Sequence, residues 1–162
     1  MHMISIVIPV FNEHESLHEL YSEINIAIKE YNDWEIIFID DGSSDGSSEK
    51  IIDILSKDSK VKLIKFYRNF GKSAALAEGF KYANGDIIIT MDADLQDDPA
   101  EIPNLISKMN EGFDLVSGWK KIRHDPWNKT FPSKIFNFFT RLLTGVKIHD
   151  FNCGLKAYKS SV

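Results

Sequence analysis

The stretch "DIIITMDADLQDDP", residues 86–99, decides the fold class, because an apolar run passes directly into four aspartates. Residues 86–90 are rich in isoleucine and predict a buried β-strand. Like charges at the end of a buried strand repel one another, so they indicate either a solvated turn or a bound positive group. In an extended loop Asp92 and Asp94 point to the same side, where a divalent cation such as Mg²⁺ or Mn²⁺ fits between or beside them.

Strands and helices alternate on both sides of this stretch. Residue patterning predicts strands over residues 3–10, 34–40, 61–66, 86–91 and 113–119. It predicts helices over residues 14–31, 41–57 with a leading turn, 71–83 and 99–109. Ser and Asp residues are candidates for the N-cap of the second helix, and residues 84–86 for the C-cap of the third. This order predicts an α/β fold with a mostly parallel sheet flanked by helices on both faces.

Polar loops follow the first four predicted strands: "PVFNE", "DDGSSDG", "RNFGK" and "DADLQDD", which begin at residues 9, 40, 68 and 92. The carboxyl ends of parallel strands meet at one edge of the sheet, where ligands bind. Neither G-x-G-x-x-G nor G-x-x-x-x-G-K-[ST] occurs in these loops, so the glycine-rich phosphate cradles are not supported. Asp40 and Asp41 can accept hydrogen bonds from a base or a ribose, and such an acidic pocket needs a metal to hold a diphosphate.

The charge is distributed unevenly along the chain, although the net charge is only -5. Residues 1–118 contain 10 Lys and Arg against 22 Asp and Glu, whereas residues 119–162 contain 9 against 2. A basic C-terminal third is expected to meet anions such as phosphates or lipid head groups, and a solvated basic face is the alternative. The single cysteine, Cys153, excludes an internal disulfide and is typical of a reducing compartment.

The stretch "SKIFNFFTRLLTGVK", residues 133–147, carries a wide apolar stripe flanked by Lys134, Arg141 and Lys147. One interpretation is an interfacial helix that lies on an anionic bilayer. The other is a helix buried in a core or in an oligomer contact, and both stay open.

Five motifs carry a resemblance that extends in order over nearly the whole chain: "IPVFNE", "IDDGSSDGS", "RNFGKSAALAEGF", "NGDIIITMDADLQDDP" and "DFNCGLKAY". Together they resemble the family-2 inverting glycosyltransferases of GT-A fold, a Rossmann-like arrangement that binds nucleoside-diphosphate sugars. The branch most similar is that of the polyprenyl-phosphate sugar transferases. The resemblance implies one catalytic domain over residues 1–162, truncated before the acceptor-site and membrane-anchoring segments of the family. It also implies a cytoplasmic protein at the cytoplasmic face of the membrane.

The resemblance assigns expected roles to individual residues. The nucleotide-sugar site would comprise Pro9, Phe11, Asn12 and Glu13 around base and ribose, Asp40 and Asp41 at their edges, and Lys72, Asp92 and Ala93. The expected ligands of Mg²⁺ or Mn²⁺ are Asp92, Asp94 and Gln96. The expected acceptor-phosphate contacts are Arg123, Lys129 and Ser133, where Lys129 replaces the Arg that relatives often have and so loses the bidentate fork. The expected catalytic residues are Asp94, Arg123 and Asp150, and Asp150 is a base, an acceptor-positioning residue or a plain capping residue.

The implied reaction moves a hexose from a UDP- or GDP-sugar to a polyprenyl phosphate. Because a phosphate acceptor is already anionic, the reaction depends less on a strong base than transfer to a hydroxyl does. Two alternatives stay open: transfer to a polysaccharide or glycan hydroxyl, with Asp150 as the base, and a sugar-nucleotide-binding fragment without activity. A membrane surface and a homo-oligomer are expected partners, and nucleic acid is not.

Overall fold

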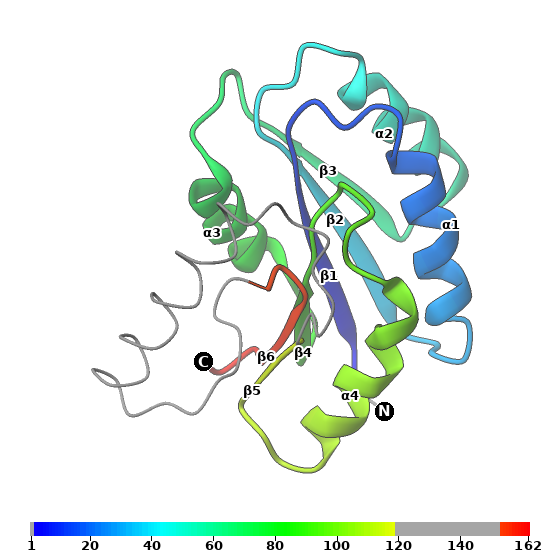
Figure 1. Ribbon diagram of the computed structural model, residues 1–162, viewed down its shortest axis with the longest axis vertical. Helices are drawn as coiled ribbons and strands as arrows, with labels where there is room; N and C mark the ends of the chain where they lie inside the picture. The colour runs from blue at the N-terminus through cyan, green and yellow to red at the C-terminus, as the bar shows by residue number, and fades with distance from the viewer. Residues whose placement is uncertain (1, 119–152) are drawn as a thin grey trace, which may run out of the picture.

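The computed structural model describes residues 2–118 and 153–162, and Figure 1 shows how its elements are arranged. The strands are β1 (Ile4–Val10), β2 (Trp34–Asp40), β3 (Val61–Lys65), β4 (Ile87–Thr90), β5 (Leu115–Ser117) and β6 (Lys156–Lys159). The helices are α1 (Leu17–Ala27), α2 (Ser47–Lys57), α3 (Lys72–Tyr82), the short 3₁₀ helix η1 (Pro99–Glu101) and α4 (Ile102–Asn110).

The strands form one mixed sheet in the order β3-β2-β1-β4-β6-β5. β1 pairs in parallel with β2 and with β4, and β2 pairs in parallel with β3. β6 runs antiparallel to both of its neighbours, so β5 runs in the same direction as β1 to β4. The prediction of a mostly parallel sheet is therefore confirmed, whereas β6 was not predicted as a strand.

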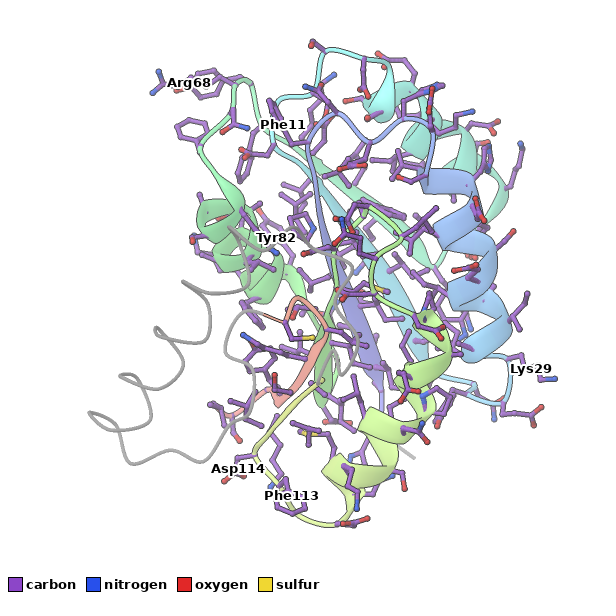
Figure 2. All side chains as sticks on the ribbon, in the orientation of Figure 1. Phe11, Lys29, Arg68, Tyr82, Phe113 and Asp114 are labelled. Atoms are coloured by element: carbon purple, nitrogen blue, oxygen red, sulfur yellow. The ribbon has the colours of Figure 1, made fainter. Side chains whose placement is uncertain are left out.

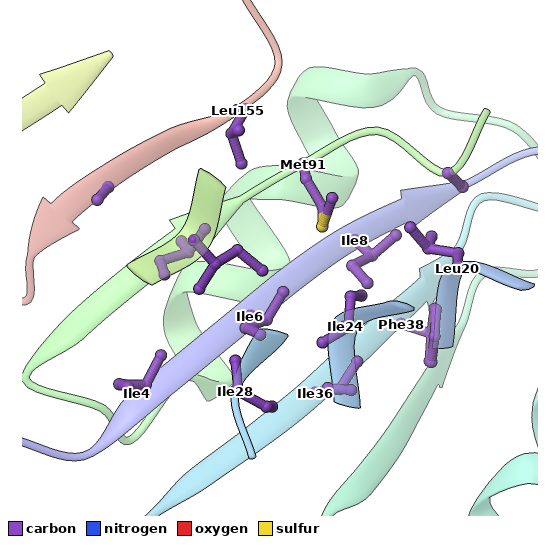
Figure 3. Packing of buried hydrophobic residues seen from close by; sticks show 14 of the residues in the cluster. Ile4, Ile6, Ile8, Leu20, Ile24, Ile28, Ile36, Phe38, Met91 and Leu155 are labelled. Carbon is purple, nitrogen blue, oxygen red and sulfur yellow. The ribbon is translucent and has the colours of Figure 1, made fainter. Parts of the chain in front are cut away.

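Helices cover both faces of the sheet, as predicted (Figure 1). Because side chains alternate along a strand, Ile6 and Phe38 face one way, and Val7 and Ile39 face the other. The first set packs in the large core with apolar residues of α1, α2 and α4. Figure 3 shows Phe38 of this set beside Leu20 and Ile24 of α1. The second set packs in a smaller cluster under α3. Glycine at position 79 lets α3 approach closely, because a Cβ there would collide with side chains of Val7 and Ile39.

Several predicted boundaries were wrong. α1 begins at Leu17 instead of residue 14, and β5 ends at Ser117. The N-cap of α2 is Gly46, with φ of 92°, and not a Ser or Asp. α3 ends at an extended Ala83, so residues 84–86 form no C-cap. Gly85 is required for close packing and not as a C-cap, because a Cβ there would lie 2.5 Å from the backbone nitrogen of Ser5.

In the part of the chain that the structure describes, no helix combines the length and the apolar character needed to cross a bilayer. The stretch at residues 133–147, expected to form an interfacial or buried helix, lies outside the described residues.

Candidate functional site at the carboxyl edge of the sheet

A cavity of about 290 Å³ opens where the first four strands end. The loops after β1, β2, β3 and β4 all contribute to it, as the alternation of strands and helices predicts. The described residues that line it are Pro9, Val10, Phe11, Glu13, Asp41, Asn69, Gly71, Lys72, Asp92, Ala93 and Asp94. Phe11 and Arg68, from the first and third loops, lie at the same end of the molecule (Figure 2).

The loop after β1 is held by the loop after β2 through four hydrogen bonds. The N–H groups of Asn12 and Glu13 donate to the hydroxyls of Ser43 and Ser47, each over 3.0 Å. The side-chain oxygen Oδ1 of Asn12 accepts from the N–H of Ser44 at 2.9 Å, and Asn12 itself has a φ of 57°. The fourth bond joins the loops one residue further on, from His14 N to Asp45 Oδ2 at 3.0 Å. These bonds fix the loop conformation that carries Phe11 and Glu13 to the cavity.

The position of Asp40 differs from the prediction. Its side chain is completely buried, and Asp40 is not among the described residues that line the cavity. One carboxylate oxygen accepts from the N–H of Ser43 at 2.8 Å, and the other accepts from the hydroxyl of Ser48 in a short contact. Asp40 therefore holds the loop and the start of α2 and does not face a ligand.

Asp41 lines the cavity and also fixes the loop after β3. Its two carboxylate oxygens accept from the N–H groups of Phe70 and Gly71, at 2.7 and 2.8 Å. The adjacent Gly42 has a φ of 76°, and a Cβ there would lie 2.5 Å from the carbonyl carbon of Arg68. This close approach brings Asn69 and Lys72 to the cavity wall.

The acidic segment after β4 curls back on itself. Asp94 Oδ1 accepts from the N–H of Gln96 at 3.1 Å, and Leu95 between them has a φ of 59°. Asp97 is buried, and its Oδ2 accepts from the N–H of Asp92 at 3.3 Å. The four aspartates are therefore not equivalent, since Asp97 turns inward to shape the loop and Asp94 is exposed.

Among the described residues, opposite charges meet inside the cavity at one place. Lys72 Nζ lies 2.5 Å from Asp92 Oδ1, and the two side chains are 52% and 30% exposed. Gly154, just before β6, packs directly against this aspartate, because a Cβ at Gly154 would lie 2.7 Å from Asp92 Oδ2. Only a glycine therefore leaves the Asp92 carboxylate in its position.

Excess negative charge remains on the rest of the cavity wall. Burial raises the pKa of the Glu13 carboxyl above its ordinary value, and the charges of Asp94, Asp45 and Asp92 add to the increase. The part of the rise that comes from the neighbouring aspartates reflects a negative local potential, which favours a bound positive charge.

A hard divalent cation fits this donor set. Carboxylate oxygens are the ligands that Mg²⁺ and Mn²⁺ prefer, and Asp92 already attracts an ammonium group to the place where a cation would bind. Within residues 2–118 and 153–162, no group of three or more His, Cys, Asp or Glu side chains is arranged as a complete metal site. Asp92 and Asp94 therefore suit a cation that completes its shell with phosphate oxygens or water.

The structure brings together most of the predicted site residues and leaves others aside. Eight line the cavity: Pro9, Phe11, Glu13, Asp41, Lys72, Asp92, Ala93 and Asp94. Asn12, Asp40 and Gln96 are not among the described residues that line it, and the first two instead hold loops. Sequence reasoning missed Val10, Asn69 and Gly71, although the first belongs to the "PVFNE" loop and the other two to the "RNFGK" loop. The roles expected for Arg123, Lys129, Ser133 and Asp150 fall outside the described residues.

The architecture is the GT-A fold, because solved structures of glycosyltransferases with that fold match nearly the whole chain. One is glucosyl-3-phosphoglycerate synthase from Mycobacterium tuberculosis in complex with phosphoglyceric acid, with a TM-score of 0.77 and 22% identity over 99% of this chain and 57% of the other. Another is a mannosyltransferase from Pyrobaculum calidifontis in complex with GDP-Man and Mn²⁺, with a TM-score of 0.72 and 20% identity over 98% of this chain and 44% of the other.

The chain belongs to glycosyl transferase family 2, whose family model matches residues 5–162. A similar curated relative is the undecaprenyl-phosphate 4-deoxy-4-formamido-L-arabinose transferase of Salmonella choleraesuis, 43% identical over 161 residues. The match covers 98% of this chain and 49% of the relative, so the chain spans about half the length of the curated relatives it matches. The family predicted from the five motifs is therefore confirmed.

Proposed function

We propose that this chain is the catalytic domain of a metal-dependent inverting glycosyltransferase that moves a sugar from a UDP- or GDP-sugar to a polyprenyl phosphate. The observation that carries the proposal is the cavity in which Lys72, Asp92 and Asp94 meet, at the edge where family-2 folds present four loops. The relatives' printed name supports the acceptor class, since it describes transfer to undecaprenyl phosphate. The sugar in that name is an arabinose derivative, which is a pentose. The proposal therefore covers pentoses as well as the hexoses that we expected from the resemblance.

The donor side of the reaction belongs to residues that the structure describes. Phe11 is half exposed beside the cavity and offers its ring to a base, while Glu13 and Asp41 offer acceptors for ribose or base donors. Lys72 supplies positive charge for the diphosphate. These groups orient the donor so that its anomeric carbon faces the acceptor, which is the main requirement of a single inverting displacement.

Asp92 and Asp94 would hold Mg²⁺ or Mn²⁺, and this pair is the D-x-D motif of the proposal. When bound, the cation stabilises the negative charge that develops on the leaving nucleoside diphosphate. Support for the metal comes from the carboxylate donors, from the raised pKa of Glu13, and from the Mn²⁺ present in the structure of the Pyrobaculum mannosyltransferase.

The acceptor side rests on residues predicted from the sequence. Arg123, Lys129 and Ser133 would bind the lipid phosphate, and Asp150 would position it or act as a base. The basic C-terminal third supports this assignment, because it suits both a phosphate and an anionic membrane surface. We further propose that the protein acts at the cytoplasmic face of the membrane.

Calorimetric titration of UDP and of GDP, each with and without Mn²⁺, tests the donor site. One nucleotide should bind in the presence of Mn²⁺, and Asp94→Asn should weaken that binding at least about tenfold, because a charged ligand of the cation is lost. Asp98→Asn is the matched control: it removes a charge from the same segment, and Asn retains the ability to cap η1, whose Ala100 N–H now donates to Asp98 at 2.9 Å. Equal effects of the two variants would contradict the proposed metal site.

The acceptor class is tested on the product. Transfer to a polyprenyl phosphate creates a glycosyl phosphate, which mild acid hydrolyses, whereas a glycan linkage survives the same treatment. An acid-stable product would overturn the lipid-phosphate acceptor and favour transfer to a glycan hydroxyl.

A further inference from the structure

Lys72 and the proposed metal compete for the same carboxylate oxygen. The ammonium of Lys72 lies 2.5 Å from Asp92 Oδ1, and both side chains border the 290 Å³ cavity together with Asp94. A cation that binds through this oxygen has to displace the ammonium, because two positive groups on one oxygen repel each other. Metal binding at this site therefore includes the free energy of breaking an ion pair.

Displacement is feasible because the pair is not locked in place. The Lys72 side chain is half exposed, and the residue is the first of α3, directly after Gly71. Gly71 has a φ of 94°, and a Cβ there would meet no heavy atom within 4 Å, so the space beside the start of the helix is open. Lysine has a flexible stem that can redirect its ammonium to another anion nearby without movement of the backbone.

The backbone of this lysine is held while its side chain is free to turn. Asp41 accepts from the N–H groups of Phe70 and Gly71, which fixes the chain immediately before α3. Lys72 also lies in the first turn of α3, where the helix dipole already favours a negative group such as a phosphate. Once the ammonium of Lys72 is released from Asp92, it and the start of the helix attract the same anion.

We propose that Lys72 is a resident counter-ion that couples metal binding to diphosphate binding. In the nucleotide-free protein it neutralises Asp92 and lowers the affinity for a divalent cation. When a nucleoside diphosphate arrives, Lys72 transfers its charge to a phosphate and Asp92 becomes available to the cation. The inference rests on the proposed function, since it assumes that the cavity takes both a metal and a diphosphate.

The coupling has a thermodynamic signature that an ordinary phosphate-binding lysine lacks. Replacing Lys72 removes the competitor of the metal, so Mn²⁺ alone should bind more tightly, while the diphosphate should bind less tightly. The factor by which nucleotide increases the affinity for Mn²⁺ must then fall, and linkage requires that Mn²⁺ increases the affinity for nucleotide by the same reduced factor.

The experiment titrates Mn²⁺ into the full chain without nucleotide, with electron paramagnetic resonance to measure free Mn²⁺. Lys72→Met should bind Mn²⁺ roughly two- to fivefold more tightly than the unmodified chain, as expected for loss of a partly exposed ion pair. The same variant should bind the nucleotide about tenfold more weakly in the presence of Mn²⁺. Lys72→Arg keeps the charge and should retain the weak affinity for Mn²⁺ alone.

Lys81→Met is the matched control. It makes the same change on the same helix and breaks a similar ion pair, in which Lys81 Nζ lies 2.7 Å from Glu78 Oε2, but it does not border the cavity. Its affinities for Mn²⁺ and for nucleotide should equal those of the unmodified chain. Thermal melting curves of all variants check that each one folds.

Two results would overturn the inference in different ways. If Mn²⁺ binds and depends on Asp94, but Lys72→Met leaves its affinity unchanged or lower, Lys72 is no competitor and the proposed metal site stands without it. If neither Mn²⁺ nor a nucleotide binds to any variant, the proposed function fails and the counter-ion role fails with it.

Discussion

Two carboxylate sites at opposite edges of the sheet are built in opposite ways. At the amino edge, Glu35 is buried and is fully engaged by the chain itself, since it accepts from the Ser5 hydroxyl at 2.6 Å and the Asn84 N–H at 2.7 Å. Its second oxygen lies 2.5 Å from Lys62 Nζ. At the carboxyl edge, Asp92 and Asp94 share a cavity with Glu13, and the one ammonium among the described residues that line it is that of Lys72.

The pKa values of the two sites shift in opposite directions. Burial alone would raise the pKa of Glu35, but the hydrogen bonds from Lys62, Ser5 and Asn84 outweigh it and lower the pKa below its ordinary value. Burial and neighbouring aspartates raise the pKa of Glu13. The amino edge thus holds a charge that stabilises the fold, and the carboxyl edge holds a cluster of charges that repel one another, as the proposed ligand site would require.

The largest expected effect is on stability at the amino edge. Glu35→Ala should lower the free energy of unfolding by about 3 kcal/mol, because it leaves buried donors of Ser5 and Asn84 without their acceptor. Urea unfolding followed by circular dichroism measures the change. Glu111→Ala, which breaks the exposed pair with Lys108, is the control and should change stability by less than about 1 kcal/mol. Similar losses in both variants would show that the Glu35 network contributes no more than a surface pair.

The pH dependence of stability should have opposite signs at the two sites. Glu35 has a lowered pKa in the folded state, so its contribution is complete above its ordinary pKa of 4.5 and is lost as the pH falls below it. Glu13 has a raised pKa in the folded state, so its ionisation reduces stability as the pH rises above 4.5.

Unfolding free energies measured between about pH 3 and pH 7 separate the two contributions. Glu35→Gln should flatten the loss of stability at acid pH, and Glu13→Gln should increase stability at neutral pH. A Glu13→Gln variant that is less stable at neutral pH would show that the Glu13 charge stabilises the folded state, which contradicts this prediction.

The smallest expected effect has the opposite sign from the first. Asp94→Asn should raise the free energy of unfolding by about 0.5 kcal/mol, because it removes repulsion among exposed carboxylates. The same urea titration detects it, and the titrations proposed above show whether nucleotide binding is lost in return. A lower free energy of unfolding in this variant would show that the Asp94 carboxylate stabilises the fold, as that of Glu35 does.

The sequence predicts the carboxyl edge better than the amino edge. The positions of Asp92 and Lys72 follow from simple topology, since each comes after an apolar strand and parallel strands end together. Glu35 gives no such signal, because a single Glu inside "WEIIFID" does not reveal that Ser5 and Asn84 surround it. Its partners come from three other segments of the chain and meet only in the folded sheet.

Two predicted site residues hold loops and do not line the cavity, for a common physical reason. Asn12 and Asp40 have the polar side chains that a ligand requires, but the backbones of neighbouring loops require hydrogen-bond partners as well. Both side chains accept from backbone N–H groups of the loop at residues 41–46. Residue type alone does not distinguish these two uses. The short strand β6 was missed for a different reason, since its sequence KAYK lacks the apolar run that marks the equally short β4.

The antiparallel direction of β6 has an evolutionary consequence. The chain leaves the sheet after β5 at Gly118 and re-enters before β6 at Cys153, and both points lie at the edge that holds the cavity. The exit and the return are joined by a hydrogen bond from Gly118 N to Leu155 O of 2.9 Å. A stretch of any length inserted between these two anchors leaves the strand register unchanged. Under the proposed function, this connection could therefore vary between relatives, and with it the acceptor, while the core that carries the donor site keeps its fold.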